Sequence, residues 1–184
     1  DHWGVRPDVL TSGKGSTSGY FPFGLTACSG EVFEAVREHG FVHGFTWSHN
    51  GVGAAVAHAA LRRLQDGDLV EASARQGERL LKSLSSALAD EPSVGDVRGI
   101  GLMVGVELVA DRASKAPFPR ALQATERVVA AAREAGLLLY SSTGHVDGRD
   151  GDLVMLGPPF VISDEECDLV VERTAAAIAS LRSA

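Results

Sequence analysis

The chain has 184 residues, of which 45% are hydrophobic and 22% are charged, and its mean hydropathy is +0.05. This composition is typical of a globular protein and excludes a disordered tail or a collagen-like chain. A net charge of −7 without a basic stripe argues against a nucleic-acid-binding surface, and no apolar run approaches the roughly 20 residues that a membrane span needs.

The first half of the chain predicts two strands and three helices. Ser29 is a residue type preferred at a helix N-cap, and Gly40 is of the type that ends a helix. Leucines recur at helical spacing in the third predicted helix, which indicates one buried face. The expected strands are residues 9–11 and 21–25, and the expected helices are residues 31–39, 51–64 and 68–90.

The second half predicts four strands and two helices. Gly99 and Gly101 mark a turn between two strands, Pro119 suits the first position of a helix, and Ser163 with Glu166 has the sequence of a capping box. The expected strands are residues 94–98, 102–109, 137–140 and 153–156, and the expected helices are residues 119–135 and a last one that starts after Ser163. Strands that alternate with helices favour an α/β or α+β fold over an all-α fold.

Other sequence signals bear on the compartment and on metals. No secretory signal pattern opens the sequence, and only two cysteines occur, Cys28 and Cys167. Two cysteines are too few for a disulfide framework, and their spacing is not that of metal ligands, so we expect no metal site and a soluble cytoplasmic protein. The chain begins at Asp1 without a methionine, which indicates a processed or truncated product.

Lys14 is the most unusual of the three lysines because Gly13 and Gly15 flank it. Such a turn keeps backbone donors close to the lysine and leaves room for a ligand. A lysine there can bind phosphate or, with a lowered pKa, act as an imine-forming nucleophile. It can equally be a loop lysine without a role, and the glycine spacing excludes a P-loop.

A polar cluster over residues 43–51 precedes the predicted Ala-rich helix. Hydroxyls and backbone amides at a helix N-terminus can form an anion site. Ordinary N-capping by Ser48 or Asn50 is the alternative interpretation, and the cluster has no metal-ligand spacing.

Four segments carry a resemblance to a known family. They are residues 3–24 around Lys14, residues 43–50 (HGFTWSHN), residues 94–103 (VGDVRGIGLM) and residues 147–160. In this order, and over essentially the whole chain, they closely resemble the class III (omega-type) aminotransferases. Those are pyridoxal 5'-phosphate enzymes of fold type I that move an amino group between an amine or amino acid and a keto acid.

The resemblance implies a role for individual residues. Lys14 matches the lysine that binds the cofactor covalently and shuttles a proton, and Thr46 matches a threonine that binds the cofactor phosphate across a homodimer interface. Arg98 would contact a substrate carboxylate or pair with Asp96 or another carboxylate, and both interpretations stay open. Arg149 would meet a substrate carboxylate or be a solvated loop charge.

The resemblance also implies the domain organisation. Residues 1–92 would be the end of the large cofactor-binding domain with the interdomain helix, and residues 93–184 the C-terminal small domain. The family's aspartate for the pyridinium nitrogen and its ring-stacking aromatic residue would precede residue 1, so the chain looks like a little less than half of an enzyme. By itself it is expected to be weakly active at most. An aminomutase or a decarboxylase on the same scaffold, and a non-catalytic binding module, are the alternatives.

Overall fold

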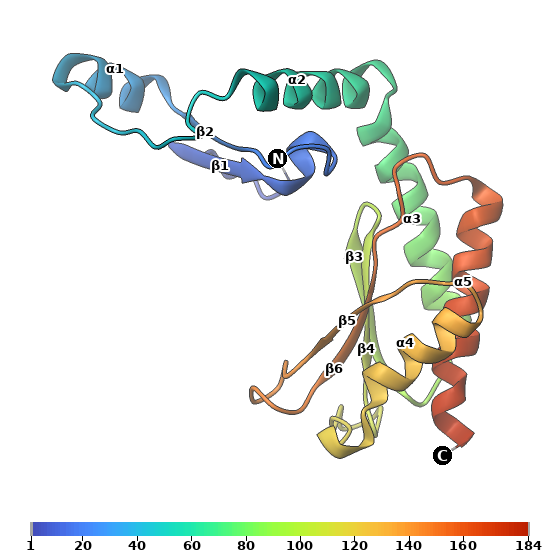
Figure 1. Cartoon of the computed structure of the whole chain (residues 1–184). Coiled ribbons are helices and arrows are strands. Elements are labelled where there is room, and N and C mark those ends of the chain that lie inside the picture. Colours follow the sequence, from blue (N-terminus) through green and yellow to red (C-terminus); the bar gives the residue numbers. More distant parts are fainter. Residues whose placement is uncertain (1, 184) are drawn as a thin grey trace. The chain divides into compact units, whose positions relative to one another are not determined.

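The structure is a computed structural model that describes residues 2–183. The chain divides into two compact units, Asp1–Asp68 and Leu69–Ala184, and each is described by itself (Figure 1).

The first unit contains a β-hairpin and two helices. Strands β1 and β2 pair antiparallel, with Val9 opposite Cys28 and Gly13 opposite Gly24. Within residues 2–68 only Thr17, Gly53 and Ala57 are buried, so this unit encloses almost no core of its own. Its elements are β1 (Val9–Gly13), a 3-10 turn η1 (Lys14–Thr17), β2 (Gly24–Cys28), α1 (Gly30–His39) and α2 (Gly51–Asp66).

Local capping explains where the two helices of this unit begin. The Ser29 hydroxyl accepts a hydrogen bond from the amide of Val32, and the Asn50 side chain accepts one from the amide of Gly53 at 2.9 Å. Each bond satisfies an amide that a helix start leaves free. The predicted Ser29 cap is therefore confirmed, and α2 begins at the predicted residue.

The second strand begins later than the sequence predicted. Residues 21–25 were expected as a strand, but β2 begins at Gly24 because the turn that follows Lys14 extends to Phe21. The amide of Tyr20 donates to the carbonyl of Thr17 at 3.1 Å, and the Thr17 hydroxyl donates to the carbonyl of Phe21 at 2.6 Å. Those bonds occupy backbone groups that a longer strand would need.

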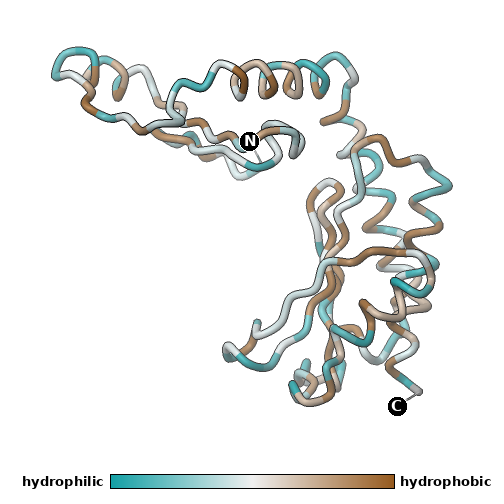
Figure 2. Tube along the Cα trace, viewed as in Figure 1, coloured by the Kyte–Doolittle hydropathy of each residue, from teal (hydrophilic) through white to brown (hydrophobic). Residues whose placement is uncertain are grey.

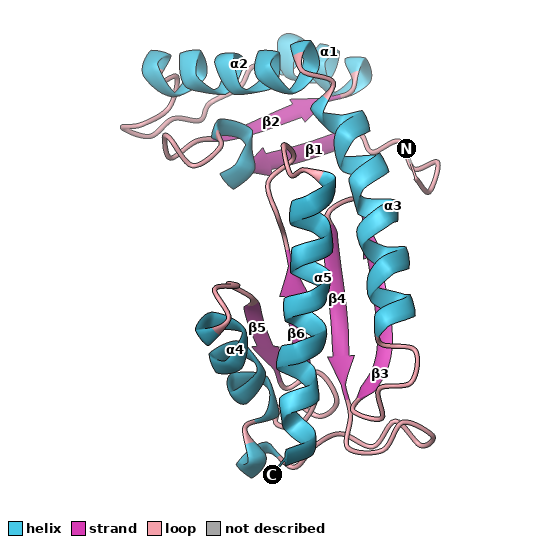
Figure 3. Ribbon diagram, turned by 90° about the vertical axis from the view of Figure 1, so that its right-hand side faces the viewer, coloured by secondary structure: helices cyan, strands magenta, loops and turns pink. Residues whose placement is uncertain are grey.

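The second unit is a four-stranded antiparallel sheet with helices on one face. The strand order is β3-β4-β6-β5, and α3, α4 and α5 cover the same face of the sheet (Figure 3). Its main elements are α3 (Leu69–Ala87), β3 (Val94–Ile100), β4 (Met103–Leu108), α4 (Ala124–Glu134), β5 (Tyr140–Thr143), β6 (Asp152–Leu156) and α5 (Asp164–Ala179). Two 3-10 turns, Arg120–Leu122 and Ser180–Ser183, complete it.

The core of the molecule lies between this sheet and its helices. The leucine face predicted for α3 is buried, with Leu80 and Leu84 completely enclosed. They pack with apolar residues of the central strands. Buried and less buried residues alternate along β4 and β6, as a half-covered sheet requires. Figure 2 shows hydrophobic segments in the strands and helices of this unit. The buried strand residues include Val104, Val106, Leu108, Val154 and Leu156.

Two predicted elements in this unit begin several residues later than the sequence predicts. The helix expected from Pro119 begins only at Ala124, because Gln123 has a positive φ of 49° and interrupts the chain after a short 3-10 turn. The strand expected at 137–140 begins at Tyr140, because the amide of Leu137 still bonds to the carbonyl of Ala132.

The fold class is confirmed as α/β, with sheets that are antiparallel in both units. The domain prediction placed a boundary between residues 92 and 93, whereas the two compact units separate after Asp68, because α3 packs on β3, β4 and α5. How the units relate to the domains of a larger enzyme stays a prediction.

Candidate active site

Lys14 lies at the first position of the η1 turn, directly after β1. Its φ is +51°, in the left-handed region that side chains other than glycine rarely adopt. Such a conformation costs about 1–2 kcal/mol and persists only where the surrounding structure holds it. Lys115 and four other non-glycine residues among those described also have a positive φ, so this conformation marks a turn held by its surroundings and does not by itself single out Lys14.

The space around Lys14 is open. Lys14 is exposed, and a Cβ atom added to Gly15 would meet nothing within 4 Å. A Cβ atom added to Gly13 would lie 3.5 Å from the carbonyl oxygen of Phe23, so the turn is open on the side of Gly15.

Thr46 lies in an irregular segment over residues 41–50 that leads into α2. It is exposed, and the turn beside it is closed by a hydrogen bond from the amide of Ser48 to the carbonyl of Phe45 at 2.9 Å. Lys14 and Thr46 belong to the same unit, but none of the described hydrogen bonds joins them. The expected role of Thr46 is to bind a cofactor phosphate across a homodimer interface, which does not require Lys14 and Thr46 of one chain to meet. Both roles remain predictions.

Alternate residues of the same segment form an aromatic row that sequence reasoning missed. Phe41, His43, Phe45 and Trp47 line a cleft of about 890 Å³ together with Phe21 and Phe23, and Thr46 is not among its lining residues. His43 lies 5.8 Å from Phe41 and 5.9 Å from Phe45, measured between ring centroids. The period-two spacing of aromatic residues was the sequence signal that could have revealed this cleft.

Arg98 is on β3, in the second unit, and its guanidinium is already bonded to two carboxylates. Its Nη1 donates to Asp96 at 2.9 Å and to Glu107 at 2.8 Å. The hydrogen bond that Arg98 donates to Glu107, followed by the one it donates to Asp96, raises the pKa of Arg98 above its usual value. The pairing expected with Asp96 is present, and Glu107 is an additional partner from the neighbouring strand β4.

Arg149 lies in the exposed loop between β5 and β6. Its backbone amide donates to Asp147 at 2.9 Å, and the amide of Asp150 donates to the same carboxylate oxygen at 2.7 Å. These bonds hold the pKa of Asp147 below its usual range. The loop is thus held by its own backbone, while the Arg149 side chain is exposed.

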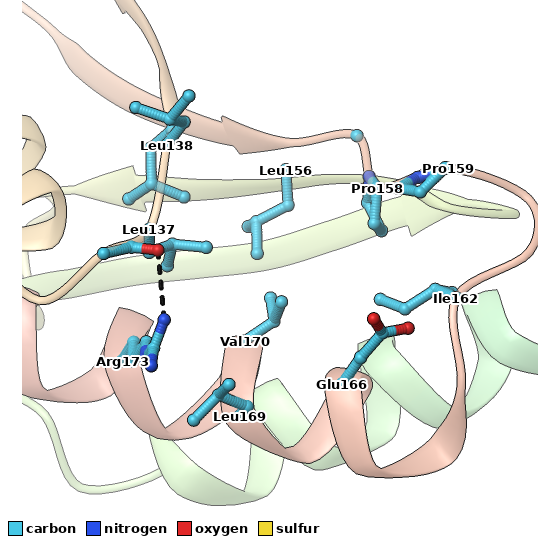
Figure 4. Close-up of a pocket in the computed structure, with 13 residues that line it drawn as sticks. Leu137, Leu138, Leu156, Pro158, Pro159, Ile162, Glu166, Leu169, Val170 and Arg173 are labelled. Atoms are coloured by element: carbon cyan, nitrogen blue, oxygen red, sulfur yellow. Dashed lines mark hydrogen bonds between the residues drawn. The ribbon is translucent and has the colours of Figure 1, made fainter.

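A second hollow in the molecule is an apolar groove of about 390 Å³ between α5 and the segment that joins α4 to β5 (Figure 4). Its two charged residues are both engaged: Glu166 accepts from the amide of Ser163 in the confirmed capping box, and Arg173 donates to the carbonyl of Gly136. The groove therefore offers shape and apolar surface without a free acid, base or nucleophile.

The described residues place no group of three or more metal-ligating side chains together. None of the helices within residues 2–183 is long and apolar enough to cross a membrane.

Comparisons with known proteins give the class of this site. The aminotransferase class III family model matches residues 1–178. The chain is 34% identical over 173 residues to the aminotransferase YodT of Bacillus subtilis, covering 93% of this chain and 39% of that protein. It is 33% identical over 182 residues to the diaminobutyrate–2-oxoglutarate transaminase of Halomonas elongata, covering 96% of this chain and 38% of that enzyme.

Solved structures agree. A transaminase from the marine bacterium Virgibacillus superposes with a TM-score of 0.91 at 36% identity, covering 98% of this chain and 41% of that one. An (S)-enantioselective omega-transaminase from Thermomicrobium roseum gives a TM-score of 0.87 at 39% identity, covering 98% of this chain and 39% of that one.

The fold is thus that of the C-terminal part of a fold type I transaminase. The chain belongs to the class III aminotransferase family, as the resemblance predicted. It spans about two fifths of the length of the curated relatives it matches.

Proposed function

We propose that this protein takes part in pyridoxal 5'-phosphate-dependent transfer of an amino group between an amine or amino acid and a keto acid. The observation that carries the proposal is Lys14, an exposed lysine held at a φ of +51° between two glycines in a chain of the class III family. Relatives named as transaminases, including one solved in its pyridoxal-phosphate-bound form, support it.

The residues present fit the cofactor. The cofactor carries an aldehyde, a flat ring and a phosphate. Lys14 supplies an accessible amine for the aldehyde, and the open space at Gly15 suits a flat ring. Thr46 supplies a hydroxyl and an amide beside the start of α2, where the partial positive charge of a helix N-terminus favours a phosphate. When bound, the cofactor supplies an electron sink for the electrons released at the substrate Cα.

This chain's own residues would then bind and move a proton. The Lys14 Nζ would hold the cofactor and, when free, would move a proton at the substrate Cα as a general base and acid. The Thr46 hydroxyl and amide would donate to the cofactor phosphate across the homodimer interface and so help to orient the group. Between the two arginines, Arg149 is the better candidate for a substrate carboxylate, because Arg98 is bonded to two carboxylates of its own sheet.

We also propose a homodimer formed through the first unit. Tyr20, Phe45 and Trp47 are 85%, 64% and 67% exposed. Exposed aromatic groups of this size mark surfaces that are covered in the working assembly. A second copy would cover them and bring Thr46 to the partner's cofactor. We further propose a cytoplasmic location, which the two free cysteines support.

An aminomutase or a decarboxylase would use the same Lys14 attachment and differs in what happens at the substrate. A non-catalytic binding module would keep the fold without the covalent attachment. A screen of amino donors and keto acids separates an aminomutase or a decarboxylase from a transaminase. The trapping experiment described next tests for a non-catalytic binding module.

The proposal is tested by covalent trapping. The protein is incubated with pyridoxal phosphate and then with borohydride, which converts the condensation product of an amine and the aldehyde, formed with loss of water, into a stable secondary amine. We expect peptide mass mapping to place the label on Lys14, with Lys82 and Lys115 as internal controls. A label confined to those two lysines would refute the assignment.

A further inference from the structure

Thr17 is the one completely buried residue of the turn that carries Lys14. Its exposed fraction is 0%, whereas Lys14 and Ser18 on either side are exposed. A buried hydroxyl is unfavourable unless it is hydrogen-bonded. Its enclosure, in a unit that buries almost nothing else, follows from the packing of α2 on this turn.

The hydrogen bonds of Thr17 connect both ends of the turn. Its hydroxyl donates to the carbonyl of Phe21 at 2.6 Å, and the carbonyl oxygen of Lys14 lies 3.4 Å from the same hydroxyl. Its own carbonyl accepts from the amide of Tyr20 at 3.1 Å. One residue therefore links Lys14, at the start of the turn, to Phe21 at its end.

The turn needs such a link because its backbone is strained twice. Lys14 and Ser18 both have positive φ values, 51° and 52°. Non-glycine residues with a positive φ revert to ordinary backbone conformations unless the surrounding structure holds them. Apart from the Thr17 bonds, one described hydrogen bond closes the turn, from the amide of Ser18 to the carbonyl of Gly15 at 3.0 Å.

We propose that Thr17 is a positioning residue for Lys14: its buried hydroxyl fixes the segment from Lys14 to Phe21 and so holds the lysine in its left-handed conformation. This inference rests on the proposed function, because it assigns Thr17 a part in presenting the cofactor-binding lysine. Thr17 itself acts only through Lys14.

The chain offers a matched set of variants. Thr17→Val keeps the shape of the side chain but removes the donor, so the carbonyl of Phe21 loses its partner. Thr17→Ser keeps the donor. Ser16→Ala is the neighbouring control, because the Ser16 hydroxyl is buried without a hydrogen-bond partner among the described residues.

The first measurement is the rate at which a lysine-specific endoprotease cleaves after Lys14 under native conditions, where cleavage follows the population of the opened turn. We expect Thr17→Val to accelerate this cleavage about tenfold, equivalent to 1.4 kcal/mol in the opening equilibrium. Thr17→Ser should stay within about twofold of the unmodified protein because it retains the hydrogen bond. Ser16→Ala should not accelerate cleavage.

Lys82 and Lys115 report whether the effect is local. Equal acceleration at all three lysines would mean that Thr17 serves general stability, and an unchanged rate at Lys14 in Thr17→Val would mean that its hydroxyl does not hold the turn. Either result overturns the proposal.

The second measurement connects the turn to the lysine's chemistry. After pyridoxal phosphate and borohydride, Thr17→Val should lower the labelled fraction of Lys14 relative to Lys115 and change the pH profile of labelling, and Thr17→Ser should restore both. Unaltered labelling of Lys14 in Thr17→Val would contradict a positioning role. If Lys14 of the unmodified protein takes no label, the proposed function fails, while the cleavage experiment still decides whether Thr17 holds the turn.

Discussion

Gly77 of α3 lies directly against Gly101, at the tip of the hairpin formed by β3 and β4. A Cβ atom on Gly77 would lie 2.2 Å from the carbonyl carbon of Gly101, closer than any real contact. Gly101 in turn has a φ of +53°. The helix and the hairpin tip can approach this closely only because neither residue has a side chain.

Gly77→Ala is therefore expected to destabilise the protein strongly. Overpacking costs about 1–3 kcal/mol, and a value at the upper end is expected because the obstructing atoms are backbone. The measurement is the urea denaturation midpoint. Gly157→Ala is the matched control, since a Cβ there meets nothing within 4 Å; similar midpoints for the two variants would contradict the close approach.

The contact of Arg98 with two carboxylates has an energetic reason. Asp96 and Glu107 are register partners on neighbouring strands, and like charges directly opposite each other are destabilising. We expect Arg98→Met to lower the stability by about 0.5–1 kcal/mol, a modest value because the triad is partly exposed. The double variant Arg98→Met with Glu107→Gln should recover most of the lost stability. If it recovers none, Arg98 stabilises the fold through a residue other than Glu107.

Asp152 is expected to be essential for the start of α4. Its Oδ1 accepts from the amide of Thr125 at 3.1 Å and from the Thr125 hydroxyl at 2.7 Å. Asp152 is buried, with an exposed fraction of 2%. Removing the carboxyl group leaves the buried amide and hydroxyl of Thr125 without a partner, which costs about 1–3 kcal/mol, and we expect Asp152→Ala to lose stability in that range. Amide hydrogen exchange along α4 measures this loss of stability. Asp90→Ala, which removes an exposed carboxylate, is the control.

Acid should weaken the contact between Arg120 and Glu126. The hydrogen bond from Arg120 lowers the pKa of Glu126 from its ordinary value of 4.5. A carboxyl with a lowered folded-state pKa stabilises the fold fully above the unfolded value, and that contribution is lost as the pH falls through the folded value. Thermal unfolding measured between pH 7 and pH 3 should show a loss of stability below about pH 4.5. This loss should be smaller in Glu126→Gln. Glu134→Gln, a control on the same helix, should lose as much stability in acid as the unmodified protein does.

Thr46→Ala is expected to weaken pyridoxal phosphate binding about tenfold or more. One hydrogen bond to a charged group contributes about 1.5–3 kcal/mol, and 1.4 kcal/mol corresponds to a factor of ten. The measurement is a cofactor titration. Thr11→Ala, an exposed threonine on β1, should bind as the unmodified protein does; equal affinities for both variants would remove Thr46 from the site.

Local sequence was sufficient where a structural feature depends on neighbours in the chain. The Ser29 cap, the capping box of Ser163 and Glu166, and the leucine face of α3 all involve residues three or four positions apart. Such contacts form in any chain that is helical there, so the sequence alone predicts them. The four segments that carry the family resemblance are likewise each contiguous, and together, in their order along the chain, they predicted the class of protein.

Tertiary structure decided the features that join distant residues. The cap of α4 comes from Asp152, 27 residues away, so the helix begins at Ala124 and not at Pro119. Glu107 became a partner of Arg98 through the register of β3 with β4, and Gly77 met Gly101 through the packing of α3 on that hairpin. Each of these pairs depends on how a sheet is paired or a helix is docked, which is settled by burial of the whole core. For that reason the sequence by itself determined the local helix caps, the buried helix face and the family. Only the fold determined the contacts between distant residues, such as the Asp152 cap of α4 and the pairing of Arg98 with Glu107.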